Sequence, residues 1–191
     1  MHPLAQKDLN YVWHPFTQMQ DWAKEEPIVI KSGKGAVLKD QHNRSYLDAN
    51  ASIWTNLHGH RHPALDKAIH NQLKKIAHSS ALGFANEPAS LLAEQLVKTA
   101  NRPVLFKDAR SGFKNPKLSK VFFSDDGSTA LEVALKLAYE HARRSGKGHR
   151  PKFLSIDHAY HGDTIGAVSI GQVDLFHKSF SGLLFSSDKA M

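Results

Sequence analysis

The chain has 191 residues, of which 41% are hydrophobic, with a formal net charge of +7 and no cysteine. This length and apolar content suit one domain with a substantial core, and the lack of cysteine excludes disulfides, thiolate nucleophiles and cysteine-based zinc sites. The basic residues are scattered and match no nucleic-acid-binding motif, so we expect no nucleic-acid partner. The sequence contains no signal-peptide pattern and no apolar run long enough to span a bilayer, so we expect a cytoplasmic protein.

Residues 1–26 contain the motif WHPFTQM (Trp13–Met19), in which Pro15 restrains His14 to an extended conformation, so we expect an ordered arm. Three short apolar or β-branched runs follow, separated by glycines and by a polar turn. They lie at 28–30, 36–38 and 45–48. This pattern predicts a small antiparallel meander.

The segment 50–63, NASIWTNLHGHRHP, is polar, aromatic and rich in histidine, which is typical of a loop that contacts a ligand. His58, His60 and His62 alternate and would share one face of a strand, as metal ligands can. However, no further ligand is placed nearby, and Gly59 and Pro63 indicate a turn. We therefore expect no metal site.

Two helices are predicted next, one from Pro63 through Ala77 and one from Pro88 to just before Pro103. Each carries an apolar stripe at helical spacing, so we expect both to face the core. Residues 103–120 have the composition of an irregular basic insertion.

The segment 121–139, VFFSDDGSTALEVALKLAY, predicts a strand, a glycine turn and a long amphipathic helix with a Glu132–Lys136 pair on its surface. We expect Ser128 or Thr129 to cap this helix. The first amide groups of a helix have no partner inside it and can bind a phosphate, and Gly127 would allow the phosphate to approach closely. An ordinary capped turn between strand and helix remains the alternative.

Two more strands are predicted, at 153–156 and 167–170, with the loop 157–164 between them. Alternating strands and helices predict an α/β fold with a parallel sheet, in which ligands bind at the carboxyl ends of the strands. Tyr160 in this loop offers an aromatic face and His158 or His161 a polar edge, although a packed surface loop is the alternative. Together with a phosphate-binding turn, Tyr160 indicates a flat, phosphorylated cofactor.

Several motifs in this order resemble one known family. They are WHPFTQM, SIWTNLHGHRHP, SDDGSTALEVALKLA, DHAYHGDTIGAVSI and VDLFHKSF. The chain is similar to the class III aminotransferases, pyridoxal-phosphate enzymes of fold type I, from about Tyr11 to Phe185. The resemblance implies an arm and small meander over residues 1–60 and the first part of the large α/β domain over 61–191.

The same resemblance implies roles for individual residues. Gly127 and Ser128 would bind the phosphate of pyridoxal 5'-phosphate, and Tyr160 would stack on its ring. Phe16 and Trp54 would line the substrate pocket. No lysine of this chain matches the motif of the Schiff-base lysine, so the resemblance places no catalytic residue here and implies an N-terminal part that is inactive alone.

The combination of the WHPFTQM arm and the AYHGDT loop resembles the branch of the family that acts in biotin biosynthesis. This implies transfer of an amino group to 7-keto-8-aminopelargonate, giving 7,8-diaminopelargonate, by a homodimer. S-adenosylmethionine is the expected amino donor and lysine the competing one. Another class III aminotransferase of ω-amino acids and a noncatalytic remnant that binds the cofactor remain alternatives.

Overall fold

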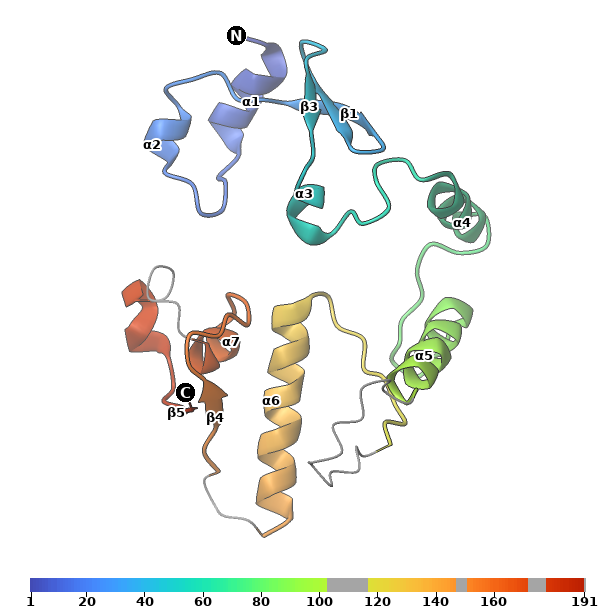
Figure 1. Ribbon diagram of the computed structural model, residues 1–191, viewed down its shortest axis with the longest axis vertical. Coiled ribbons are helices and arrows are strands. Elements are labelled where there is room, and N and C mark those ends of the chain that lie inside the picture. The colour runs from blue at the N-terminus through green and yellow to red at the C-terminus, as the bar shows by residue number, and fades with distance from the viewer. Residues whose placement is uncertain (103–116, 147–150, 172–177, 191) are drawn as a thin grey trace. The chain divides into compact units, whose positions relative to one another are not determined.

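The computed structural model describes residues 1–102, 117–146, 151–171 and 178–190 (Figure 1). The chain forms two compact units, Met1–Phe84 and Ala85–Met191, and each is described here by itself. Among the described residues, no helix has the length and apolar character needed to cross a membrane.

The first unit contains four helices and a three-stranded sheet. The helices are α1 (Pro3–Tyr11), α2 (Met19–Trp22), α3 (Ala51–Trp54) and α4 (Pro63–Leu73), and the strands are β1 (Ile30–Lys34), β2 (Val37–Asp40) and β3 (Ser45–Leu47). The strands are antiparallel in the order β1-β2-β3, which confirms the predicted meander. The first strand begins two residues later than predicted because the Gln41 side chain accepts the Val29 amide at 2.8 Å.

The second unit contains α5 (Glu87–Ala100), α6 (Gly127–Arg144), α7 (Ile165–Ile170), a 3₁₀ helix η1 (Lys178–Leu183), β4 (Leu154–Ile156) and β5 (Asp188–Ala190). The α5 helix starts where predicted, because the Asn86 side chain accepts the Ala89 amide at 3.0 Å and Pro88 occupies the first turn. The strands β4 and β5 pair in parallel, as an α/β fold requires. The long helix α6 packs against α7, and α7 packs against β4 (Figure 1).

Two predicted strands are wrong. Residues 121–123 have no regular secondary structure, because no described strand pairs with them and a strand needs a hydrogen-bonded neighbour. Residues 167–170 belong to helix α7. Their apolar run is compatible with a buried helix or a buried strand, and Ala167, Val168 and Ile170 are buried.

The predicted core-facing stripes of α4 and α5 are also wrong for the described chain. Leu65, Ile69 and Leu73 of α4 are exposed, as are Leu91 and Leu92 of α5. A helix buries its apolar stripe only where another layer packs on it, and no described element does so here.

Most of the predicted insertion at 103–120 lies outside the described residues, and residues 117–120 have no regular structure.

Candidate functional site

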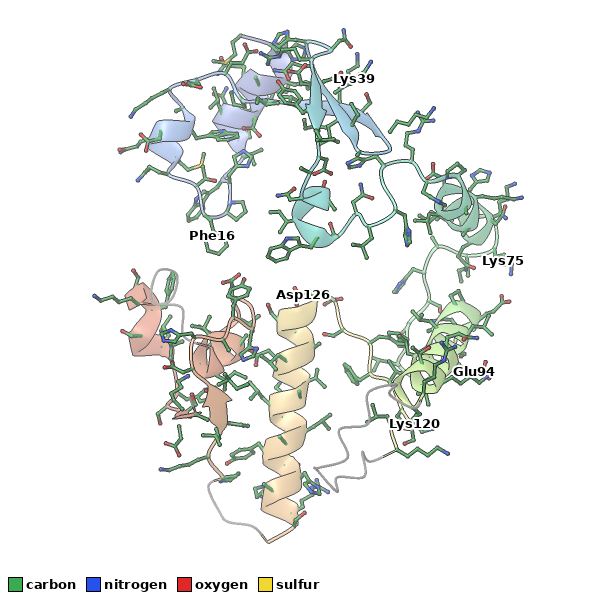
Figure 2. The ribbon with its side chains drawn as sticks, viewed as in Figure 1. Phe16, Lys39, Lys75, Glu94, Lys120 and Asp126 are labelled. Carbon is green, nitrogen blue, oxygen red and sulfur yellow. The ribbon has the colours of Figure 1, made fainter. Side chains whose placement is uncertain are left out.

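The amino end of α6 is built by a reciprocal pair of hydrogen bonds. The Thr129 amide donates to Asp126 Oδ1 at 2.7 Å, and the Asp126 amide donates to Thr129 Oγ1 at 3.0 Å. Asp126 is therefore the capping residue, and not Ser128 or Thr129 as predicted from the sequence. Thr129 completes the capping box from inside the helix. The Thr129 amide and hydroxyl hold the pKa of Asp126 below its usual value. Figure 2 shows Asp126 at this end of α6.

Ser128 joins this helix end to the loop 157–164. Its Oγ accepts the Asp163 amide at 3.3 Å. Gly162 lies against the same hydroxyl, is buried and has φ of +112°, so an added Cβ would overlap Ser128 Oγ. Only glycine allows the loop to approach the helix this closely.

Tyr160 lies in this loop, and its hydroxyl donates to Asp163 Oδ2 at 2.7 Å. This bond, which the phenolate cannot make, raises the pKa of Tyr160, so the hydroxyl stays protonated at neutral pH. Tyr160 is 52% exposed. The structure thus brings Ser128 and the Tyr160 loop together at one end of α6, through Asp163.

One turn further along α6, Glu132 provides a second link to the same segment. Its Oε1 accepts the Gly166 amide at 2.8 Å, at the start of α7, and an added Cβ at Gly166 would overlap the carboxylate. The Thr164 hydroxyl and then the Gly166 and Ala167 amides hold the pKa of Glu132 below its usual value, against the effect of burial. The sequence had suggested a surface pair with Lys136, and nothing local to 132–136 signals the role in holding α7.

In the first unit, the Asp8 carboxylate contacts the chain on both sides of Phe16, at His14 and at Trp22. Asp8 Oδ2 lies 2.9 Å from His14 Nε2 and accepts the Trp22 indole N–H at 3.0 Å. The hydrogen bond from His14 is the main cause that holds the pKa of Asp8 below its usual value.

Phe16 lies between these two attachment points, with φ of +51°, and the residue is 77% exposed. It projects from the turn between α1 and α2 (Figure 2). It also lines an open hollow of about 660 Å³ together with Trp22 and Ile28.

Trp54 lies in an unusual turn. The residues of α3, Ala51 to Trp54, all have φ between +50° and +67°, although none is glycine. This conformation costs about 1–2 kcal/mol per residue relative to the right-handed one, so the turn must be held by its surroundings. Trp54 is 76% exposed.

The histidines of the 58–62 segment do not form a metal site among the residues that the structure describes. His60 Nε2 instead lies 2.8 Å from Asp48 Oδ2, and Asn56 Nδ2 lies 2.8 Å from the other ring nitrogen. His58 and His62 have their ring centres 5.8 Å apart. The sequence had not suggested Asp48, since it lies at the end of a predicted strand.

The five predicted site residues thus fall into two groups. Gly127, Ser128 and Tyr160 lie together in the second unit, while Phe16 and Trp54 lie in the first. The binding role of each stays a prediction.

The residues at the start of α6 fit a phosphate. The position of a Cβ at Gly127 meets no atom within 4 Å, so a ligand can approach the backbone there. Ser128 adds a hydroxyl, and the helix has 18 residues, enough for a full dipole at its amino end. Asp126 keeps its negative charge, because the Thr129 hydrogen bonds lower its pKa, and it would oppose a phosphate close to it; its Oδ1 is directed at the Thr129 amide.

Comparison with known proteins decides the family. The sequence pattern described as Aminotransferase class-III matches residues 18–187. This chain belongs to the class III aminotransferases. The family depends on pyridoxal phosphate.

Relatives within the class III aminotransferases include the adenosylmethionine-8-amino-7-oxononanoate aminotransferase of Staphylococcus aureus. It is 46% identical over 187 residues, covering 96% of this chain and 38% of the relative. The solved structure of the enzyme of the same name from Methanocaldococcus jannaschii has 42% identity and a TM-score of 0.86, covering 98% of this chain and 40% of that one. The chain therefore spans about two fifths of the length of the proteins that it matches.

A more distant class III structure, the omega transaminase of Pseudomonas jessenii in complex with PMP, has 26% identity and a TM-score of 0.83. The match covers 99% of this chain and 39% of that one. These likenesses confirm the predicted fold type I of the aminotransferases for the region that the chain covers.

Proposed function

We propose that the complete protein containing this chain is the aminotransferase of biotin biosynthesis that converts 7-keto-8-aminopelargonate to 7,8-diaminopelargonate. The observation that carries this proposal is the identity of 46% to a relative named for that reaction, over nearly the whole chain. The geometry at the start of α6 supports it, because this helix end and the Tyr160 loop offer a phosphate-binding turn beside an aromatic ring.

In this proposal Gly127 and Ser128 hold the cofactor phosphate, and Tyr160 covers one face of the cofactor ring. Asp163 orients the Tyr160 side chain through its hydroxyl and the loop through the Ser128 contact. Bound pyridoxal phosphate supplies the electron sink for amino-group transfer, while the protein supplies orientation and electrostatics. Phe16 and Trp54 line the pocket for the amino acceptor and donor.

Three further features belong to the same proposal. The residues 1–60 form the arm and meander, and 61–191 the first part of the large domain. The complete protein is a cytoplasmic homodimer. S-adenosylmethionine is the amino donor, in agreement with the names of the relatives.

The test is a steady-state assay of the complete gene product with 7-keto-8-aminopelargonate as acceptor and either S-adenosylmethionine or lysine as donor. We expect diaminopelargonate to form with S-adenosylmethionine at a kcat/KM at least tenfold above that with lysine, because each pocket contact that a donor misses is worth about tenfold. A higher kcat/KM with lysine than with S-adenosylmethionine would identify lysine as the amino donor. Turnover of ω-amino acids without turnover of 7-keto-8-aminopelargonate would contradict the proposed reaction.

The cofactor site has a separate test in Ser128→Ala. Removing a hydroxyl that binds a charged phosphate should weaken pyridoxal phosphate affinity about tenfold, measured by absorbance titration. Ser145→Ala at the opposite end of the same helix is the matched control and should leave the affinity unchanged. If the two variants bind pyridoxal phosphate with equal affinity, Ser128 is not part of the phosphate site.

A further inference from the structure

The α3 turn presents Trp54 in a conformation that its sequence does not favour. Ser52 and Ile53 have φ and ψ near +50° to +60°, close to the ideal left-handed helix. Hydrogen bonds close the turn, since the Trp54 amide donates to the Asn50 carbonyl at 2.9 Å and the Thr55 amide to the Ala51 carbonyl at 3.1 Å. Ile is among the residues least suited to positive φ. A strained segment of this kind persists only where its surroundings determine it, and it is typical of functional sites.

Asp48, at the end of β3, supplies the restraint. Its Oδ1 accepts the Ser52 amide at 2.8 Å, and its Oδ2 accepts the Ser52 hydroxyl at 2.8 Å. The Asp48 side chain is only 7% exposed, so the carboxylate lies beneath the turn. Both of its oxygens are thus engaged by the second residue of the left-handed segment.

His60 attaches the same carboxylate to the sheet. Its Nε2 lies 2.8 Å from Asp48 Oδ2. Its backbone is fixed to the β1–β2 turn, because the His60 amide donates to the Gly35 carbonyl at 2.8 Å and the Gly35 amide donates back at 3.0 Å. Since Asn56 Nδ2 contacts the other ring nitrogen at 2.8 Å, the ring also holds the residue that follows the turn. Through its contacts with Ser52 and His60, Asp48 therefore connects the left-handed turn to the meander.

We propose that Asp48 is a positioning residue that holds α3 in its left-handed turn and so sets the orientation of Trp54 in the substrate pocket. Asp48 acts through the turn and not on the substrate, because its carboxylate is covered and is used by Ser52 and His60. This inference rests on the proposed function, since Trp54 is a pocket residue only within it.

The first experiment compares Asp48→Asn with Asp40→Asn in the complete gene product. An asparagine at 48 keeps the shape but places an N–H₂ group against donors from Ser52 or His60, so the turn loses part of its restraint. Asp40 is the matched control, because it is a fully buried carboxylate of the same unit that holds a different turn, through the Arg44 amide and guanidinium. We expect Asp48→Asn to raise the KM for 7-keto-8-aminopelargonate about tenfold with kcat within about threefold, the pattern of lost uniform binding.

Asp40→Asn should lower the melting temperature but leave the KM as in the wild type. An equal change of KM in the two variants would overturn the proposal, because Asp48 would then act only through general stability.

A rescue experiment tests whether the turn is the intermediary. Glycine adopts positive φ without strain, so Ala51→Gly should help the left-handed turn to form without its full restraint. In the Asp48→Asn background, Ala51→Gly should return the KM to within about threefold of the wild type. A double variant whose KM stays at the Asp48→Asn value would show that Asp48 acts by another route.

A measurement without substrate separates this inference from the proposed reaction. For each protein, the fluorescence of its Trp54→Phe counterpart is subtracted, which isolates the Trp54 signal from that of every other tryptophan, Trp13 and Trp22 included. We expect the acrylamide quenching constant of Trp54 to change in Asp48→Asn and not in Asp40→Asn, even if the protein uses another amino acceptor. An unchanged Trp54 signal in Asp48→Asn would overturn the positioning role whatever the substrate.

Discussion

At the scale of single residues, acidic side chains hold turns throughout this basic chain. Asp8, Asp40, Asp48 and Asp126 each accept hydrogen bonds from residues close to them in the sequence. Asp40 is the most buried of them and accepts from Arg44 and Tyr46. Burial raises the pKa of Asp40, but the Arg44 guanidinium, the Tyr46 hydroxyl and two amides outweigh it and hold that pKa well below its usual range.

The left-handed turn gives a prediction at the same scale. Replacing Ala51 by glycine removes a methyl group that positive φ disfavours, so we expect Ala51→Gly to keep or raise the free energy of unfolding, by up to about 1 kcal/mol. Ala138→Gly, at an exposed position inside α6, is the matched control and should lower it by about 0.5–1 kcal/mol. Urea unfolding measures both. If Ala51→Gly lowers the free energy of unfolding as much as Ala138→Gly does, the left-handed conformation at Ala51 is contradicted.

At the scale of elements, α6 organises the second unit through two links on one face. Ser128 contacts Gly162 and Asp163, and Glu132, four residues later, contacts Gly166. Residues four apart on a helix face the same side, so a single helix face holds both the loop with Tyr160 and the start of α7. Glycine is needed at 162, where φ is +112° and a Cβ would overlap Ser128, whereas a Cβ at Gly166 would displace the Glu132 carboxylate from its hydrogen bond.

Glu132→Gln tests this link. The amide side chain has one acceptor oxygen in place of two and no charge, so α7 should open more often, and hydrogen exchange of the Gly166 and Ala167 amides should quicken about tenfold. Glu94→Gln is the matched control, since Glu94 forms an exposed pair with Lys98 on α5 and should leave these amides unchanged. Equal exchange rates in the two variants would argue against the Glu132 link.

At the scale of the whole molecule, many carboxyls have a lower pKa in the folded chain than their ordinary one. They include Asp8, Asp40, Asp48, Asp126, Glu132 and Glu140. Glu140 is an example, since hydrogen bonds from Arg143 and then Arg144 lower its pKa to about 2. The Ser52 amide and hydroxyl, and then His60, act in the same direction on Asp48. The folded form is therefore favoured where these groups are ionised.

A pH dependence follows from these shifts. A carboxyl with a depressed folded pKa contributes its full stability above its unfolded pKa, near 4, and loses it as the pH falls through the folded value. We expect the urea midpoint to be nearly constant from pH 7 to about 5 and to fall steeply below about 4. The destabilisation by Asp40→Asn should shrink as the pH falls from 4 to 2.5. If the difference in urea midpoint between the wild type and Asp40→Asn does not depend on pH, the Asp40 charge does not stabilise the fold.

Local patterns in the sequence predicted the meander, the starts of α4, α5 and α6, and the strand β4. These elements depend on periodicity, on glycine and proline positions, and on capping side chains within a few residues, all of which can be read along the chain. The proximity of Ser128 to the Tyr160 loop was implied by the family resemblance, and the hydrogen bond through Asp163 confirms it.

The sequence by itself thus determined the family, the α/β class and the long helix that begins near Gly127. Only the tertiary structure decided that residues 165–170 form a helix, that Glu132 binds the start of α7 in addition to its charge interaction with Lys136, and that Asp48 and His60 support a left-handed turn. The physical reason is that each of these features depends on a contact between separated residues, such as Glu132 with Gly166 or Asp48 with His60. An apolar run at 167–170 fits a strand and a helix equally well, and only the neighbour that binds its first amides selects the helix.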